Sequence, residues 1–145
     1  MSRPFRLASL LRLRGIAEDR AAVELAAATR RRDEAERRRL DTEVMLGNAS
    51  LPARADELHW RAAIASRTAL SGLLLEHGTR VARAQDDVDG AQDVWSQART
   101  ATRTLEKLEE RHDAEVRSED ERAEQAVLDE VAGRRRPAGA DGGSR

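Results

Sequence analysis

The sequence contains no cysteine and no tyrosine, and it has one phenylalanine and two tryptophans among its 145 residues. The absence of cysteine excludes disulfides and thiolate metal sites. A globular domain of this length normally closes around large aromatic and aliphatic side chains, yet aromatic residues make up only 2% of this chain. The composition is rich in Ala, Arg, Glu, Asp and Leu, which is typical of long helices and coiled coils.

Long apolar runs are also absent. No stretch approaches the roughly 20 apolar residues that a membrane-spanning helix needs. The early arginines are not followed by the apolar core and small-residue cleavage site of a signal peptide. We therefore expect a soluble, cytoplasmic protein.

Neither sign of charge is in excess, but the two signs are unevenly placed. The chain has 26 Lys+Arg and 27 Asp+Glu, for a net charge of −1. Residues 1–40 carry eleven Arg against six acids, whereas residues 105–130 carry eleven acids against four bases. The chain is basic early and acidic late.

Proline is scarce, and its three positions divide the chain. Pro4, Pro52 and Pro137 leave two long intervals without a helix breaker. Gly-rich sequence after residue 133 cannot bury enough apolar surface to order itself. We predict a coiled-coil hairpin over residues 1–133, with a helix at 5–46, a turn at 47–52 and a helix at 53–131, and a disordered tail at 134–145.

The second predicted helix carries a seven-residue repeat, formed by two series of positions. One series is Trp60, Arg67, Leu74, Val81, Val88, Trp95, Thr102, Glu109 and Val116. The other is Ala63, Leu70, His77, Ala84, Ala91, Ala98, Leu105 and His112. A sustained 3.5-residue repeat keeps one seam facing a partner helix. The predicted fold is all-α, a long antiparallel two-helix coiled coil with unequal arms.

The first predicted helix supplies the matching stripe. Its apolar positions are Leu7, Leu11, Ala21, Leu25, Ala28, Ala35 and Leu40, and polar interruptions fall at Arg14, Glu18 and Arg32. Folding the chain about residue 50 places Leu7 against Trp95. Residues beyond about 100 then lack a partner in the chain, and an unpaired acidic helix calls for another protein. The repeat stays in register through Gly72, Gly78 and Gly90, which favours one helix but leaves open whether they bend it.

Catalytic and metal-binding patterns are not found. His59, His77 and His112 lack metal-ligand spacing, and no nucleophile or phosphate-loop motif occurs. A two-helix fold also offers no enclosed site. We expect no enzymatic activity, no metal, no cofactor and no small-molecule substrate.

The arginine runs and the two tryptophans each allow two interpretations. The arginine runs 30–32, 37–39 and 134–136 could bind nucleic acid or lipid, but the first two alternate with acids and lack aromatic neighbours. A solvated helix face, with no nucleic acid bound, is the better interpretation. Trp60 and Trp95 serve either as seam anchors, which we favour, or as partner contacts.

Several stretches occur together in one protein family. They are residues 5–14 (FRLASLLRLR), Glu18-Asp19, residues 21–25, Trp60 and Trp95, residues 105–111 (LEKLEER), Glu119, Glu124-Gln125 and Leu128-Asp129-Glu130. In this ordered series the chain resembles the FliJ family of flagellar type III export proteins, over about residues 5–132.

The resemblance implies a role as a stalk like the γ subunit of rotary ATPases. It implies three partners: the flagellar export ATPase hexamer, the membrane protein of the export gate, and export chaperones. It also implies a location at the inner face of the cell membrane. The implied ATPase contacts are Phe5, Leu7, Leu10, Leu11, Glu124, Gln125, Leu128 and Asp129. The implied gate contacts are Leu70, Leu73 and His77. The alternative to this role is a generic coiled-coil scaffold or a homodimeric adaptor.

Overall fold

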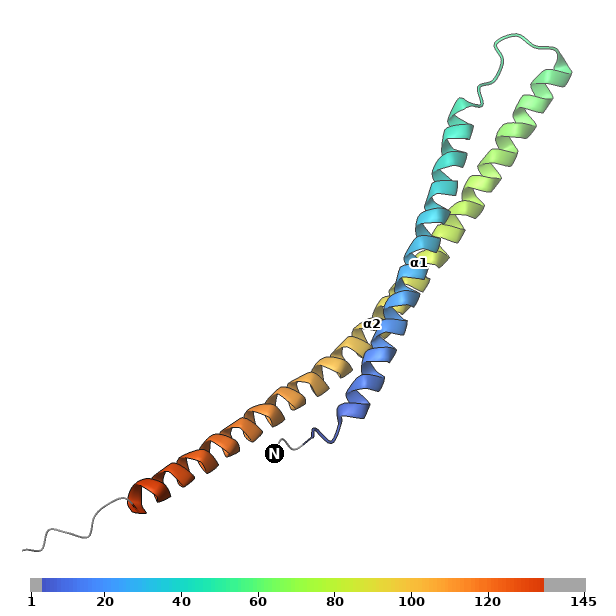
Figure 1. Ribbon diagram of the computed structural model, residues 1–145. Coiled ribbons are helices and arrows are strands. Elements are labelled where there is room, and N and C mark those ends of the chain that lie inside the picture. Colours follow the sequence, from blue (N-terminus) through green and yellow to red (C-terminus); the bar gives the residue numbers. More distant parts are fainter. Residues whose placement is uncertain (1–3, 135–145) are drawn as a thin grey trace, which may run out of the picture. The chain divides into compact units, whose positions relative to one another are not determined.

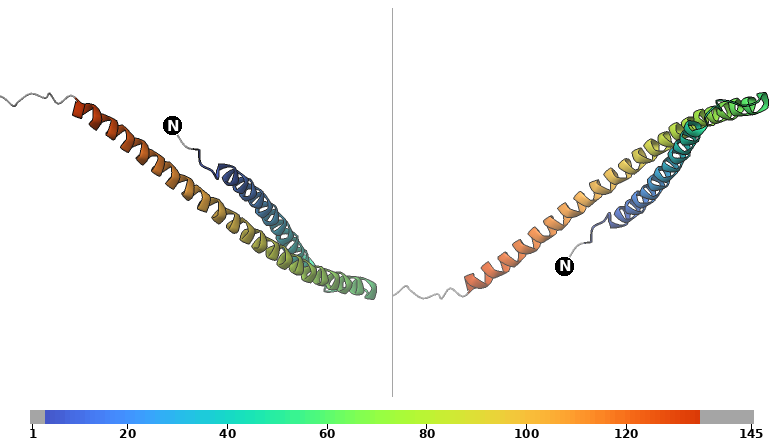
Figure 2. Two further views of the ribbon diagram at one scale, coloured as in Figure 1. Left: turned by 90° about the horizontal axis from the view of Figure 1, so that it is seen from below. Right: turned by 90° about the horizontal axis from the view of Figure 1, so that it is seen from above.

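The computed structural model describes residues 4–134, which form two helices (Figure 1). Helix α1 spans Ala8–Asn48, and α2 spans Glu57–Arg134. Figure 2 shows both as unbroken ribbons from two further sides. Helix α2 continues through Gly72, Gly78 and Gly90. The described residues contain no strand, so the predicted all-α fold of two long, unequal, packed helices is confirmed. The predicted tail lies outside the described residues from 135 onward.

Contacts divide the chain into two compact units. The larger unit is Arg14–Ala101, and it holds most of α1, the connection and the first part of α2. Among the described residues, the smaller unit joins residues 4–13 to residues 102–134. No helical segment among residues 4–134 combines the length and the apolar character required to cross a membrane.

The covered face of α2 is the seven-residue repeat. In the larger unit every member of the two series from Ala63 to Ala98 is half-buried, and Trp60 is the exception at 41% exposed. In the smaller unit Thr102 and Leu105 are buried, and the later members of the series are half-buried. The 3.5-residue spacing therefore predicts the packed face of α2 correctly.

The covered face of α1 in the larger unit is built from small side chains. Ala21, Ala28 and Thr42 are buried, and short side chains at a helix contact permit a close approach of the two axes. Thr42 takes the place expected for Leu40, which is 45% exposed. The reason is the repeat itself, because Thr42 lies seven residues after Ala35 and two heptads after Ala28.

The register of the two helices differs from the one predicted. Glu18 of α1 pairs with Arg99 of α2, so the pairing in the larger unit is shifted from the one expected for a chain folded about residue 50. The shift arises at the connection, residues 49–56. There the Arg67 guanidinium, about ten residues into α2, donates hydrogen bonds to the Leu46 and Ala49 carbonyl oxygens at the end of α1. The first turns of α2 thus run past the end of α1.

The register shift also moves the start of the unpaired part of α2. In the smaller unit the rings of Phe5 and His112 lie 5.6 Å apart, so α2 still has a neighbour at residue 112. Half-burial continues to Val116 and Ser118. Every residue from Glu119 to Arg134 is exposed. The unpaired part therefore begins near residue 119, and not near residue 100 as predicted.

Helix α2 begins at Glu57, four residues later than the expected start at Ala53, because Asp56 caps it. The Asp56 carboxylate accepts a hydrogen bond of 2.9 Å from the His59 backbone N–H, which satisfies one of the unpaired donors of the first turn. This backbone hydrogen bond is the largest cause that lowers the pKa of Asp56, and the hydrogen bond with the His59 ring is the second.

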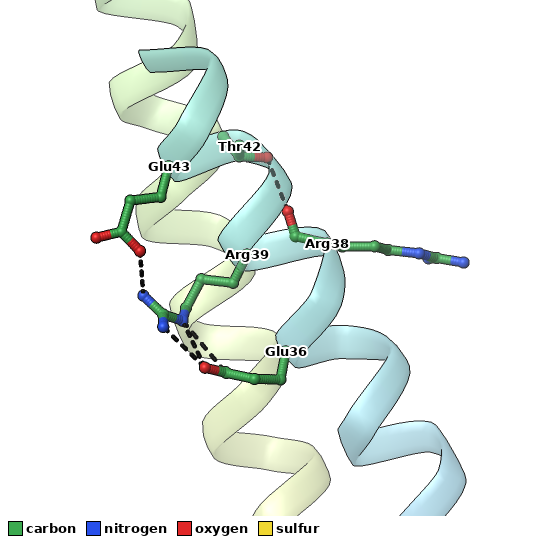
Figure 3. A network of polar contacts seen from close by, with 5 residues as sticks. All are labelled: Glu36, Arg38, Arg39, Thr42 and Glu43. Atoms are coloured by element: carbon green, nitrogen blue, oxygen red, sulfur yellow. Dashed lines mark hydrogen bonds and ion pairs between the residues drawn. The ribbon is translucent and has the colours of Figure 1, made fainter. Parts of the chain in front are cut away.

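A local network of charges holds Arg39 beside the seam (Figure 3). Its guanidinium donates to Glu36, at 2.7 Å, and to Glu43, at 3.1 Å. The hydrogen bond from Arg39 lowers the pKa of Glu36. One turn away, the Thr42 hydroxyl donates a hydrogen bond of 2.9 Å to the Arg38 carbonyl oxygen. The polar group of this buried side chain is therefore satisfied.

Candidate partner-binding surfaces

The exposed end of α2, residues 119–134, is both acidic and partly apolar; we call it the acidic end. Ala123, Glu124, Val127 and Leu128 line a shallow, mostly apolar hollow of about 430 Å³ on it. Val127 and Leu128 are 60% and 63% exposed. Exposed aliphatic side chains rimmed by carboxylates are typical of a docking surface for another protein.

Four of the residues implied as ATPase contacts lie on the acidic end. Glu124 and Leu128 line the hollow. The Gln125 side-chain amide donates a hydrogen bond of 3.1 Å to the Asp129 carboxylate, one turn further on. The four side chains therefore occupy one continuous stretch of helix surface.

The N-terminal residues implied as ATPase contacts lie elsewhere in the smaller unit. Phe5 and Leu11 are half-buried, whereas Leu7 and Leu10 are 39% and 38% exposed. Phe5 packs on His112, twelve residues before Glu124, or about 18 Å along a helix. The structure does not bring the two implied groups together.

The implied gate contacts lie on α2 in the larger unit. Leu70 and His77 belong to the repeat and are half-buried, and Leu73 is 43% exposed beside them. His77 borders a hollow of about 210 Å³ that is shared with α1 and lined by Arg31, Glu34, Ala35, Arg38 and Arg80. Leu73 is therefore the most accessible of the three to a partner.

The electrostatics of the smaller unit favour a basic partner. The carboxylates from Glu106 to Glu124 form no ion pair with any described residue. Most of these carboxylates are exposed, so a cationic surface can pair with them at low desolvation cost. Within residues 4–134 no group of three His, Cys, Asp or Glu side chains is placed to hold a metal ion.

Sequence reasoning missed two members of the apolar hollow, Ala123 and Val127. Val127 lies three residues after Glu124 and Ala123 lies four residues after Glu119, and positions i, i+3 and i+4 share a helix face. That spacing was the signal that could have found them.

Comparison with known proteins bears on these surfaces. No curated protein and no solved structure matches the chain. The family model described as the flagellar FliJ protein matches residues 2–137, which include both helices and the acidic end. The chain therefore belongs to the FliJ family of flagellar export proteins.

Proposed function

We propose that this chain is a non-enzymatic component of the flagellar type III export apparatus and acts as a γ-like stalk. In this role it binds the export ATPase hexamer and the export-gate membrane protein, and it assists export chaperones. It works in the cytoplasm at the inner face of the cell membrane. Family membership supports the export role, and the acidic end supports the stalk.

The observation that carries the stalk proposal is the exposure of α2 from Glu119 to Arg134. A helix without tertiary contacts is marginal in water, so a partner that covers its apolar hollow gains both burial and helix order. A ring of subunits with basic side chains at its pore meets these needs. Opposite charge then speeds the encounter.

The experiment is analytical ultracentrifugation of the chain alone and with the export ATPase of the same cell, combined with an ATP hydrolysis assay. We expect one copy to co-sediment with each ATPase hexamer and hydrolysis to rise. A chain that leaves both the ATPase assembly and its hydrolysis unchanged contradicts the stalk. A tight homodimer that ignores the ATPase supports a scaffold or adaptor instead.

The gate contact has a separate test. Leu73→Asp changes an exposed position, and Leu75→Asp is its matched control, because Leu75 is 77% exposed and lies outside the implied set. We expect the first variant to weaken binding to the cytoplasmic part of the gate protein about tenfold and the second to leave it unchanged. Equal effects of the two variants contradict a contact at residues 70–77.

A further inference from the structure

A basic surface on α1 has no role in the function proposed above. Ala27, Arg30, Arg31, Asp33, Glu34 and Arg37 line a shallow hollow of about 530 Å³ in the larger unit. The side chains of Arg30, Arg31 and Arg37 form no hydrogen bond or ion pair with any residue between 4 and 134. We call these three arginines the basic face.

The acids of this hollow do not neutralise the basic face. Asp33 lies 2.9 Å from the Arg32 guanidinium, and Glu34 pairs with Arg38. Both carboxylates are therefore already paired with arginines other than the three of the basic face. On the neighbouring helix Arg80, which shares another hollow with Arg31, is itself paired with Glu76 at 2.6 Å. The hollow keeps three unmatched guanidinium groups, which bind carboxylates well through paired N–H donors.

The same chain carries a surface of opposite sign. Residues 113–124, the acidic segment, hold six acids and two arginines, none of them ion-paired within the described residues. A second hollow, of about 320 Å³, lies there and is lined by Ala114, Glu115, Ser118, Glu119 and Arg122. Asp113 and Asp120 do not line this hollow, but both are exposed on the same segment.

The spacing of the charges also agrees. Arg30 and Arg37 are seven residues apart, and so are Asp113 and Asp120. Seven residues are two helical turns, or about 10 Å, so two helices laid side by side can match both pairs at once. We propose that two copies of this chain associate, with the basic face of one copy bound to the acidic segment of the other.

The association is weak and sensitive to salt, because exposed ion pairs contribute little each and are screened. Sedimentation velocity at about 100 µM protein tests it, in about 50 mM and about 500 mM NaCl. We expect a dimer at low salt and a monomer at high salt. A chain that is monomeric in both buffers overturns the proposal.

Charge reversal tests the surfaces themselves. We expect Arg30→Glu/Arg31→Glu/Arg37→Glu to weaken the dimer at least about tenfold, and Asp113→Lys/Asp120→Lys to do the same. The matched control is Arg20→Glu/Arg83→Glu/Arg103→Glu, which changes the net charge equally at exposed, unpaired and scattered positions. We expect the control to dimerise more strongly than the basic-face variant.

Mixing provides the decisive comparison. Equal amounts of the two reversed variants present opposite charges again, so the mixture should dimerise where each variant alone does not. Circular dichroism on each variant establishes that the helices are intact. A mixture that stays monomeric overturns the proposal. Loss of binding to phosphatidylglycerol vesicles or duplex DNA, with no effect on self-association, also overturns it and assigns the basic face to that ligand.

Discussion

Glu18 and Arg99 form an ion pair of 2.6 Å across the seam, although 81 residues separate them in the sequence. The Glu18 side chain is 13% exposed and the Arg99 side chain 42%. A largely covered carboxylate of this kind discriminates between registers, because a slip of one heptad replaces its partner Arg99 by Gln92 or Glu106, neither of which is a cation.

We expect Glu18→Ala to lower the free energy of unfolding by about 1–2 kcal/mol, because it leaves the Arg99 guanidinium without its carboxylate in the seam. The matched control is Glu24→Ala, an exposed and unpaired glutamate on the same helix. Urea unfolding followed by circular dichroism measures both. Equal stabilities of the two variants would show that the pair contributes nothing.

Replacing Ala28 by leucine tests the close approach of the helices. Ala28 is only 2% exposed, so the larger side chain must force the helices apart or adopt a strained rotamer, at a cost of about 1–3 kcal/mol. Ala26→Leu, on the exposed side of the same turn, should change the stability little. The midpoint of thermal unfolding distinguishes them, and a stabilised Ala28→Leu variant contradicts this packing.

Asp56 gives a pH dependence with a definite sign. Its pKa is lowered by the hydrogen bond from the His59 backbone N–H and then by the His59 side chain. The cap therefore contributes fully above the ordinary aspartate value of 3.8, and its contribution is lost as the pH falls through the lower folded value. The Asp56 carboxyl and His59 amide chemical shifts in NMR spectra report this titration.

The control for this titration is Asp56→Asn, which keeps a cap of similar strength without a titrating group. We expect the His59 amide shift of this variant to stay constant over the same acidic range. An Asp56 carboxyl that titrates above 3.8 in the folded chain contradicts the cap.

Leu128→Asp tests the acidic end. Leu128 is 63% exposed, so the folded chain should tolerate the change, while a partner that covers the hollow loses apolar burial and gains an unpaired charge. We expect binding to the export ATPase to weaken about tenfold or more. Val94→Asp, 59% exposed in the other unit, is the matched control. Undiminished binding of the Leu128 variant places the ATPase contact elsewhere.

The packed face of α2 was predictable from the sequence because a seven-residue repeat acts along a single helix and needs no knowledge of the partner. The two series from Ala63 to Val116 therefore agree with the burial observed. The prediction that Leu40 is covered was wrong because it followed hydrophobicity and not the seven-residue spacing. The polar Thr42 continues the repeat.

The register was not predictable in the same way. Every heptad shift brings similar side chains together, so the choice depends on specific polar contacts such as those of Glu18 and Arg67. These contacts follow from the length of the connection, and that length depends on Asp56 as the cap of α2. The resemblance implies that the N-terminal and C-terminal contact groups share one tip, and in the structure Phe5 of the first group packs on His112, twelve residues before Glu124 of the second.

The contacts of the larger unit span very different stretches of chain, from 18 residues between Ala49 and Arg67 to 81 residues between Glu18 and Arg99. Closing a short loop costs less entropy than closing a long one, and each later contact adds only a small increment once its inner neighbour has formed. The contacts between α1 and α2 therefore form first near the connection and last near Glu18, and on heating they are lost in the reverse order. The contacts that form first join residues close together in the chain, so we expect folding to be rapid. We also expect the pairing to open first at the end remote from the connection.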